Sequence, residues 1–457
     1  MKSYNYLESV QQYLDLYRDA GQLLADNSCS TLNACREEAR RALAEQGLPS
    51  RKSELYRYTD VPAAFAPDYG LNLSRLEMKA DPYKAYRCSV PNMGTSLFYM
   101  VNDWFYEAPH ARQSLPEGLY VGSLRAYADA HPHELGQYYA RLADVDADGV
   151  TALNTLLSQD GLLIIVPDGL KLTVPLQVVN LLHSSVNLMT NRRTLVLVGD
   201  GADVSLLFCN HTLDRDVQFL NTHVVETYVG RGASLHWYDI EETEPATHTF
   251  QNEYISLDAG SRLEHVGITL RNGVSRHTRR VTFCGEHSSA SLLGGVVATG
   301  LQHVDNHLVI DHSVPNCQSD ILYKYVLDGK SVGAFAGRVL VRPDAQKTES
   351  VETNSNLCVS PDAHMYTQPM LEIYADDVKC NHGSTVGQID EAALFYMAQR
   401  GVSPDEARLL LQHAFVNEVI SRIELPALRD RLSLMVEQRF RHASSAGCAD
   451  CGLCKTR

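Results

Sequence analysis

The sequence lacks long apolar runs and an excess of basic residues, and each absence excludes a class of protein. The longest apolar run, Gly161-Leu-Leu-Ile-Ile-Val-Pro167, ends at a proline and is far shorter than the roughly 20 residues of a membrane-spanning helix. The formal net charge of −15 argues against nucleic acid or an anionic membrane surface as a partner, because both attract basic patches. The first residues contain no apolar signal-peptide core, so we expect a cytoplasmic protein.

Motifs for nucleotide binding and hydrolysis are also missing. Asp328-Gly-Lys-Ser331 is similar to the end of a phosphate-binding loop, but Lys324 occupies the position of the required first glycine. Gly199-x-Gly201 lacks the third glycine of a dinucleotide fingerprint. No Ser-His-Asp order and no His-Glu-x-x-His motif occurs. We therefore expect a protein that is not an enzyme and has no ATP site of its own.

The centre of the chain, from about residue 151 to 388, has β-strand character throughout. Short alternating runs are separated by turns, and a small-residue turn recurs about every 30 residues before a strand. A repeat of this length without helices favours a parallel β-helix, in which each coil stacks on the next. A β-sandwich is the competing interpretation, and Asn272-Gly273 is the one hairpin-type turn that would support it. The recurring turns are Gly201-Ala202, Gly232-Ala233, Gly260-Ser261, Ser288-Ser289, Lys330-Ser331 and Asp362-Ala363.

Helical periodicity marks both ends of the chain. A helix is predicted near the start, and a second from Ser30, as its cap, to Gln46. After Asp390 helices return, with Ser403-Pro-Asp-Glu406 as a capping box. We predict a mainly β protein with four segments: an N-terminal helical or mixed domain over 1–150, a β-helix core over 151–388, a C-terminal helical domain over 389–441 and a flexible cysteine-rich tail over 442–457.

Cys380 and His382 form the strongest candidate site within the repeat region. We expect the alternating strand through Leu371 and Ile373 to end in Asp-Asp and then to present both side chains on one face at its end, because residues two apart on a strand share a face. A thiolate and an imidazole together suit iron or zinc. Gly383 would leave room for a ligand or partner to approach. A structural cysteine and an exposed histidine are the alternative.

The same region resembles the SufD family, subunits of SUF iron–sulfur cluster assembly complexes. The resemblance rests on Gln368-Pro-Met-Leu-Glu-Ile-Tyr-Ala-Asp-Asp-Val-Lys-Cys-Asn-His-Gly-Ser-Thr-Val-Gly387 and on Leu394-Phe-Tyr-x-x-x-Arg400-Gly401. A looser match begins at Ala152, and a partial one lies in residues 47–60, which we expect to form an exposed turn and a short helix. The related SufB family has His-Glu where this chain has His382-Gly383, which favours SufD.

The resemblance implies a fold, partners and roles for these residues. It implies a right-handed parallel β-helix, a heterodimer with SufB formed through the two β-helices, and docking of the ATPase SufC on the C-terminal helices. A transient iron–sulfur cluster would form at the SufB interface, with His382 as a participant and Cys380 at the same interface. No cofactor would be bound tightly by this chain alone, and ATP would bind only to the partner ATPase. A homodimer is the alternative for the isolated chain.

Two further groups of residues have metal-ligand character. His303, His307 and His312, near Cys317, are either a metal ladder or polar residues on a solenoid face. Cys448, Cys451 and Cys454 in the tail have the spacing of metal-binding thiolates, with His442 or a partner residue as a fourth ligand. The alternative is a flexible, oxidation-prone tail.

Two other functions remain open from the sequence. A β-helix enzyme acting on carbohydrate would need paired carboxylates, and Asp376-Asp377 is the only such pair at a strand end. Adjacent strand residues point to opposite faces, which does not suit two carboxylates acting on one substrate. A metal delivery protein would depend on the cysteine-rich tail alone. The eleven cysteines in 457 residues do not suggest a disulfide framework.

Overall fold

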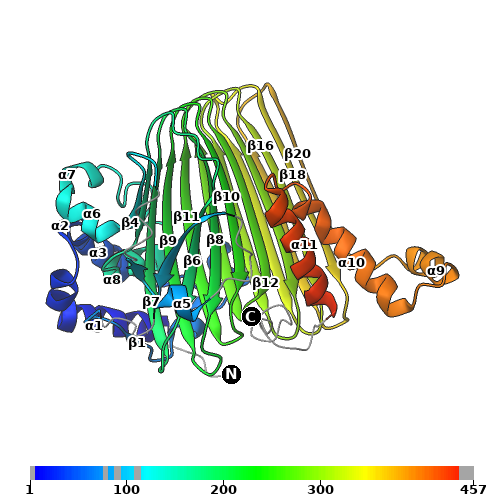
Figure 1. The fold of residues 1–457 in the computed structure, drawn as a ribbon, viewed down its shortest axis with the longest axis horizontal. Coiled ribbons are helices and arrows are strands. Elements are labelled where there is room, and N and C mark those ends of the chain that lie inside the picture. Colours follow the sequence, from blue (N-terminus) through cyan, green and yellow to red (C-terminus); the bar gives the residue numbers. More distant parts are fainter. Residues whose placement is uncertain (1–5, 76–80, 87–93, 108–114, 442–457) are drawn as a thin grey trace.

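A parallel β-solenoid of about 8 turns forms the body of the molecule, with helices at its N- and C-terminal ends (Figure 1). The computed structural model describes residues 6–75, 81–86, 94–107 and 115–441. The mainly β solenoid predicted from the repeat is confirmed. In the described part of the chain, no helix has both the length and the apolar character needed to cross a membrane.

Successive strands of the solenoid alternate between two ten-stranded sheets. One sheet has the order β19-β17-β15-β13-β11-β9-β7-β5-β4, with β1 beside β7, and the other has the order β20-β18-β16-β14-β12-β10-β8-β6-β2-β3. All pairs among β5 to β20 are parallel, whereas β2–β3 and β4–β5 are antiparallel. The strands are β1 (Gly70–Leu71), β2 (Ser96–Val101), β3 (Trp104–Tyr106), β4 (Tyr120–Ser123), β5 (Leu162–Val166), β6 (Leu176–Leu182), β7 (Leu188–Val198), β8 (Asp203–Thr212), β9 (Phe219–Val229), β10 (Ser234–Glu242), β11 (Thr247–Leu257), β12 (Arg262–Arg271), β13 (Val274–Phe283), β14 (Ser289–Ala298), β15 (His303–His312), β16 (Gln318–Leu327), β17 (Val332–Val341), β18 (Thr348–Cys358), β19 (His364–Ile373) and β20 (Val378–Gly387).

The hairpin that would have supported a sandwich does not form. Asn272-Gly273 joins β12 to β13, but these strands belong to different sheets and do not pair with each other. Gly273 is needed because a Cβ there would lie 2.2 Å from the carbonyl oxygen of Pro245 in the neighbouring coil. The dipeptide is thus a tight corner of the solenoid.

The turns of the repeat belong to two different corners, which explains its uneven spacing. One corner buries a small side chain in every coil, at Ala202, Ala233, Ser261, Ser288 and Cys317. The other corner, before the odd-numbered strands, includes the turns at 330–331 and 362–363. The turn at Asn316-Cys317 was not predicted, because asparagine supplies there the positive φ of 62° that glycine provides elsewhere.

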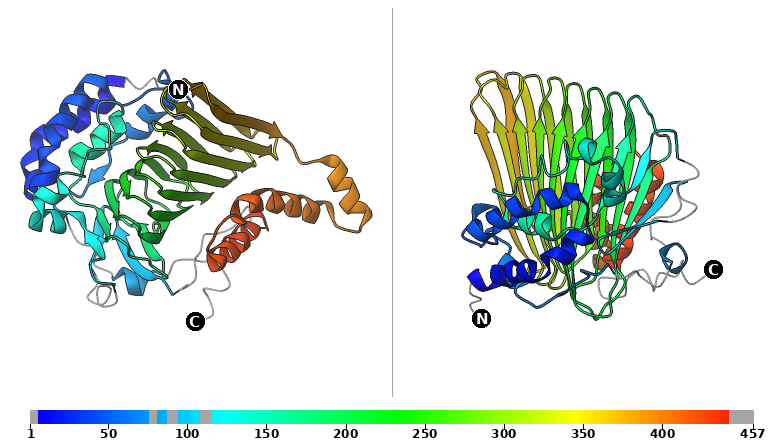
Figure 2. Two further views of the ribbon diagram at one scale, coloured as in Figure 1. Left: turned by 90° about the horizontal axis from the view of Figure 1, so that it is seen from above. Right: turned by 90° about the vertical axis from the view of Figure 1, so that its left-hand side faces the viewer.

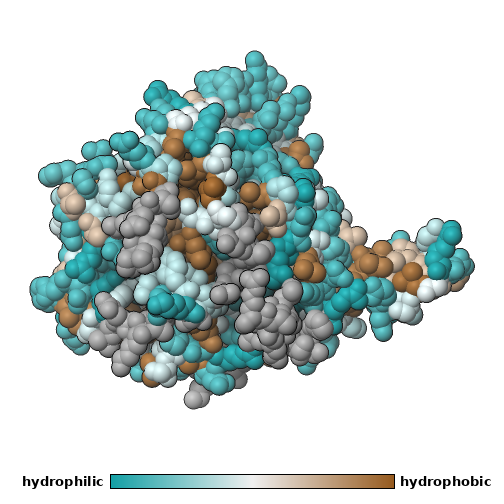
Figure 3. All heavy atoms as spheres, viewed as in Figure 1, coloured by the Kyte–Doolittle hydropathy of each residue, from teal (hydrophilic) through white to brown (hydrophobic). Residues whose placement is uncertain are grey.

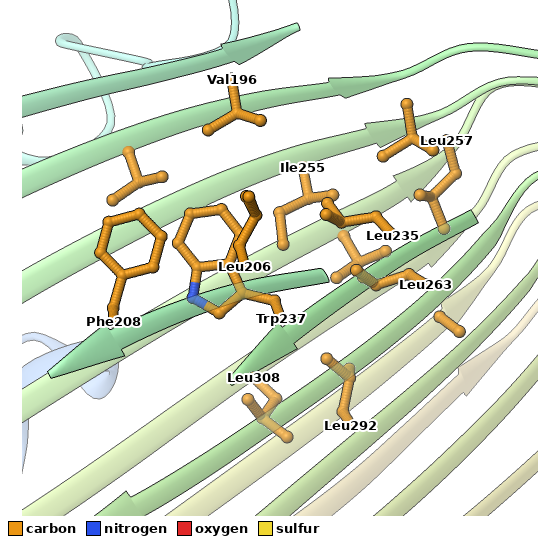
Figure 4. Close-up of a cluster of buried hydrophobic side chains, with 14 of the residues drawn as sticks. Val196, Leu206, Phe208, Leu235, Trp237, Ile255, Leu257, Leu263, Leu292 and Leu308 are labelled. Atoms are coloured by element: carbon orange, nitrogen blue, oxygen red, sulfur yellow. The ribbon is translucent and has the colours of Figure 1, made fainter. Parts of the chain in front are cut away.

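Strand alternation fills the solenoid interior with apolar side chains (Figure 4). Phe208 of β8 stacks on Trp237 of β10, with ring centroids 4.6 Å apart. Both come from the same sheet, and Ile255 and Leu308 face them from the opposite sheet. This core is continuous from the first coil to the neighbourhood of Cys380 in the last.

The N-terminal helices lie against one sheet at the beginning of the solenoid (Figure 2). They bury apolar side chains over Met189, Leu220 and Phe250, which point outward from β7, β9 and β11. The helix predicted over Ser30–Gln46 is broken at Cys35, and Ser30 is its first residue rather than its cap. The helices are α1 (Tyr6–Asp26), α2 (Ser30–Ala34), α3 (Arg36–Gln46), the 3-10 helix η1 (Glu54–Tyr56), α4 (Val61–Phe65), α5 (Pro82–Ala85), α6 (Leu124–Ala130), α7 (Pro132–Leu135) and α8 (Gly149–Leu157).

Three helices follow the last strand: α9 (Glu391–Gln399), α10 (Pro404–Ile420) and α11 (Pro426–Arg441). The predicted N-cap is confirmed, because the Ser403 hydroxyl accepts a hydrogen bond from the backbone N–H of Glu406. Helices α10 and α11 fold back over the outer face of the β20-to-β3 sheet. There Val416, Val419 and Leu432 pack on apolar side chains of the middle strands.

Candidate functional site

The last coil of the solenoid, formed by β19 and β20, has no further coil stacked on it within the described residues. Each of the two strands is the final member of its sheet and pairs only with the strand one coil earlier. No residue of either strand is buried, whereas almost every residue of the early strands is. Their outer N–H and C=O groups form two unpaired strand edges. We call this surface, residues 364–387, the open end.

Cys380 and His382 lie within the open end and share a face, as predicted. Their position differs from the prediction, because the chain turns at residues 374–377 and both side chains belong to a new strand, β20, in the opposite sheet. In the parallel ladder Cys380 is opposite Ser350 and His382 is opposite Glu352, whose side chains are buried inside the solenoid. The thiol and imidazole therefore face the solenoid interior, and no further coil covers them.

The two side chains differ in exposure. Cys380 packs partly against the solenoid core, and this burial raises the pKa of its thiol above the ordinary value. The thiol is thus protonated at neutral pH and becomes a good metal ligand only after losing its proton. His382 is exposed. Gly383 also meets open space, since a Cβ there would have nothing within 4 Å.

Beneath His382 lies a buried carboxyl group, Glu352, that the sequence analysis missed. Glu352 is 1% exposed, and neither carboxyl oxygen has a hydrogen-bond partner within the described residues. Burial raises its pKa to about 8. Gly337 makes room for it from the opposite sheet, because a Cβ there would lie 1.9 Å from one carboxyl oxygen. Glu352 precedes His382 by 30 residues, which is the length of one repeat. This spacing could have predicted that the two residues lie opposite each other on neighbouring strands.

Polar groups also line the interior next to this carboxyl. The hydroxyl of Thr367 in β19 donates to Asn354 Oδ1 at 2.8 Å and lies 2.6 Å from the hydroxyl of Ser384 in β20. Ser384 in turn donates to the same amide oxygen at 3.2 Å. These bonds tie the two sheets together across the last coil, so the open end is an ordered surface.

Apolar side chains are exposed around this polar centre. Tyr374 is 63% exposed, Val386 50% and Val351 47%. Tyr366, on the outer face of β19, stacks on Tyr58 with ring centroids 4.6 Å apart. Exposed apolar groups beside two unpaired strand edges are typical of a protein interface.

The segment at residues 47–60 is less exposed than predicted, and it contains the contact partner of His303. Tyr56 and Thr59 are buried, and the Thr59 hydroxyl donates to Asp305 at 2.6 Å and lies 3.1 Å from His303 Nε2. His303 is thus a structural contact to the N-terminal region. Burial lowers its pKa below the ordinary value.

The histidines of β15 do not form a metal ladder. His303 and His307 face away from the solenoid interior, whereas His312 has the opposite parity and stacks inside on Phe283, with ring centroids 4.4 Å apart. Burial lowers the pKa of His312 to about 4. Cys317 is buried at its corner, where its thiol contacts the Gly285 carbonyl.

Helix α9 projects from the molecule as an arm (Figures 1 and 2). It has no buried residue, and Phe395 and Tyr396 are 66% and 57% exposed. Hydrophobic atoms are visible along this arm in the space-filling view (Figure 3). The arm is a second apolar surface that the chain itself leaves uncovered.

The remaining candidates are the aspartate pair, the glycines of the two loop motifs and the cysteines. Asp376 and Asp377 lie exposed in the turn between β19 and β20. Gly201 and Gly329 are left-handed turn residues of the solenoid, with φ of 67° and 65°. All cysteines within the described ranges are free thiols. Cys448, Cys451 and Cys454 lie outside the described residues.

Comparison with known proteins identifies two matching family models. The model described as "SUF system FeS cluster assembly, SufBD core domain" matches residues 181–415, and "SufBD protein N-terminal region" matches residues 7–178. The core match contains almost the whole solenoid, the open end and most of α10. The N-terminal match contains the helices and strands at the opposite end.

Individual relatives carry the same description. A Synechocystis protein named as an iron–sulfur cluster assembly SufBD family protein is 27% identical over 88% of this chain and 90% of its own length. A Mycobacterium leprae protein of the same description is 36% identical over 39% of this chain and 47% of its own length. The Escherichia coli iron–sulfur cluster assembly protein SufD is 30% identical over 46% of this chain and 50% of its own length.

Proposed function

This chain belongs to the SufBD family of iron–sulfur cluster assembly proteins, and we propose that it acts as a scaffold subunit of a SUF complex rather than as an enzyme. The observation that carries the proposal is the open end. It combines two unpaired strand edges, exposed apolar side chains and a Cys–His pair on one ordered surface. Such a surface can both bind a partner and present ligands to iron or sulfur at the contact.

The partner that suits this end is a second β-solenoid, which we take to be SufB. Strands of a partner can extend a sheet by pairing with its free edge, and exposed side chains then decide which partner fits. Tyr374, Val386 and Val351 supply apolar area beside the edges. In the isolated chain the same surface would pair with a second copy of itself, giving a homodimer.

Iron and sulfur are the cargo of this site rather than resident cofactors. His382 offers an exposed imidazole, and its neutral form is a ligand for iron. Cys380 is less accessible and is held protonated by burial, so we assign it the secondary role at the interface. A transient cluster would then be completed by groups of the partner subunit.

The arm formed by α9, together with α10 and α11, is the proposed docking site for the ATPase SufC. Phe395 and Tyr396 provide an apolar contact. Helices α10 and α11 then connect this contact to the middle strands of the solenoid. ATP would bind to the ATPase alone, consistent with the missing phosphate-binding loop in this sequence.

Affinity purification of the full chain from its native cell tests the proposal. We expect a paralogous solenoid subunit and an ABC-type ATPase to co-purify with it. Deletion of residues 391–457, and the double change Phe395→Ala with Tyr396→Ala, should remove the ATPase and retain the paralogue. Val186→Ala, at an exposed apolar residue far from the arm in the sequence, is the control and should retain both. Purification of the folded chain with neither partner would contradict the assignment.

A further inference from the structure

A cluster of three potential metal ligands lies between the solenoid and the C-terminal helices, outside the open end. Its members are His236 of β10, Glu264 of β12 and Glu424 in the loop between α10 and α11. One ligand atom of each residue lies within 4.8 Å of the other two. His236 and Glu264 are direct partners in the parallel ladder, so the two strands hold them side by side.

The two distances from His236 are close to those of a metal-bound set, and all three atoms lie within 4.8 Å of one another. His236 Nδ1 is 3.4 Å from Glu264 Oε2 and 3.6 Å from Glu424 Oε2. A tetrahedral Zn²⁺ ion with bonds of about 2.0–2.1 Å holds its ligand atoms about 3.3 Å apart. Small side-chain movements would therefore bring all three atoms into contact with one ion, and a fourth position would remain for water.

The surroundings favour a bound cation. Asp203 Oδ1 lies 3.8 Å from His236 Nε2, so three carboxylates surround the imidazole. Arg262 is the one cationic side chain paired with them, through Glu424 at 2.6 Å. Within the described residues, three carboxylates thus lie around one imidazole, and a single guanidinium pairs with them.

Glu264 supplies an independent indication of a ligand. It is only 4% exposed, and its neighbours are the Tyr238 hydroxyl and His236 Nδ1, which lies 3.4 Å from its Oε2. A buried carboxylate is costly unless its charge is balanced, and coordination of a cation is one way to balance it.

We propose that His236, Glu264 and Glu424 form a binding site for a divalent transition metal of the Zn²⁺ class, which clamps the α10–α11 loop to the solenoid. Residues 421–425 also reach the strands through the buried side chain of Ile423 and the ion pair between Arg422 and Asp320 at 2.6 Å. An ion at the cluster would link β10, β12 and this loop. It would thereby fix the helices that carry the projecting arm.

Zn²⁺ titration by calorimetry tests the proposal on the full-length chain. The background carries changes that remove the other candidate ligands: Cys380→Ala, His382→Ala, Cys448→Ser, Cys451→Ser and Cys454→Ser. We expect this background to bind one Zn²⁺ ion in preference to Mg²⁺. Glu424→Gln should weaken Zn²⁺ binding at least tenfold, and His236→Ala should abolish it.

Glu418→Gln is the matched control. Glu418 pairs with Lys324, so this change also removes one ion pair between α10 and the solenoid but touches none of the three ligands. It should leave Zn²⁺ affinity unchanged. Because the Glu424 side chain is half exposed, Glu424→Gln should fold normally. Amide exchange in residues 421–425 should slow when Zn²⁺ is added to the background and should not change in the Glu424→Gln variant.

Two results would overturn the metal site. One is equal Zn²⁺ binding by the background and by His236→Ala. The other is a loop whose amide exchange responds to pH but not to Zn²⁺, which would make the cluster an ion pair of protonated His236 with its carboxylates. Both results leave the proposed assembly role untouched, because that role depends on the open end.

Discussion

The two ends of the solenoid are closed in opposite ways. At the first coil, β4 pairs antiparallel with β5, and β2 extends the other sheet beside β6 and pairs antiparallel with β3. All residues of α8 are buried there. At the last coil, no further described strand pairs with β19 or β20, and neither strand has a buried residue. Solenoids need capped ends for solubility, and free strand edges invite pairing. This contrast between the two ends is the reason we propose the open end as the partner surface.

Charged groups follow the same division. At the capped end Glu226 is fully buried and accepts hydrogen bonds from Arg193 at 2.6 Å and from the backbone N–H groups of Ala140, Leu142 and Ala143. Next to the open end, Glu352 of β18 is buried without a hydrogen-bond partner among the described residues. The first arrangement fixes the N-terminal region on the sheet. The second makes the last coil less stable than its burial suggests.

The largest expected effect is the loss of stability when the capped end is broken. Glu226→Ala leaves Arg193 buried without its counter-ion and frees three backbone donors, so we expect a loss of about 3–5 kcal/mol in the free energy of unfolding, measured with urea. The control is Glu372→Ala at the open end, where the pair with Arg338 is over one third exposed and the loss should stay below about 1 kcal/mol. Equal losses would remove the contrast between the ends.

The next effect concerns Glu352 and depends on pH. Its folded-state pKa of about 8 lies above the ordinary 4.5, so the folded state binds the proton more tightly. Proton binding to Glu352 therefore stabilises the folded state. This contribution is fully present below about pH 4.5 and is lost as pH rises through 8. Glu352→Gln keeps the neutral shape, so its free energy of unfolding should gain up to about 5 kcal/mol on that of the original chain between pH 4.5 and pH 8.

Urea unfolding from pH 4 to 9 measures this difference. Glu349→Gln is the control, because Glu349 lies on the same strand but is exposed and paired with Lys379. A constant difference between Glu352→Gln and the original chain across this pH range would show that the carboxyl is not held neutral.

Partner binding should respond to charges placed on the open end. Tyr374→Glu with Val386→Glu puts two carboxylates among exposed apolar groups and should weaken pairing at least tenfold with little change in folding, as for other surface substitutions. Leu301→Glu is the control, since Leu301 is 84% exposed in a turn away from β19 and β20. Size-exclusion chromatography of the isolated chain and pull-down with the paralogue measure the effect. Full binding by the double variant would place the interface elsewhere.

The smallest effect is expected from the cysteine-rich tail. Changing Cys448, Cys451 and Cys454 to serine should lower the metal content after reconstitution while complex assembly remains intact. Three thiolates with this spacing can surround one ion, but the small polar neighbours in the sequence offer few supporting groups. Metal analysis and pull-down measure the two quantities, and equal metal content in both chains would remove the tail from consideration.

Much of the fold could be predicted because it depends on a local repeat. Each turn of the Gly232-Ala233 type marks a corner of the solenoid. A residue with left-handed backbone conformation precedes a small buried residue there. At Asn316-Cys317 neither residue matches the small-residue turns of the other coils, so the repeat could not be recognised there. Cys380 and His382 lie on a shared face, as the alternation predicted. The predicted strand ran past the true end of β19 at Ile373, because nothing in the local sequence distinguishes a continuing strand from a corner at residues 374–377.

The less predictable features depend on contacts between distant segments. Glu352 is buried only because Gly337 of the opposite sheet leaves space for it. His236 meets Glu424 only because α10 and α11 fold back over β10 and β12. Neither relation has a signature in the spacing of residues along the chain. The β20 motif, by contrast, identified the family from sequence alone.

The central claim is that the open end is the assembly site, and His382→Ala tests it most directly. The side chain is exposed, so the substitution should lower the free energy of unfolding by about 1 kcal/mol or less. In cells that depend on this pathway, the variant should assemble its complex normally but fail to restore iron–sulfur cluster maturation, with Cys380→Ala showing a weaker defect. Normal maturation with His382→Ala would contradict the account.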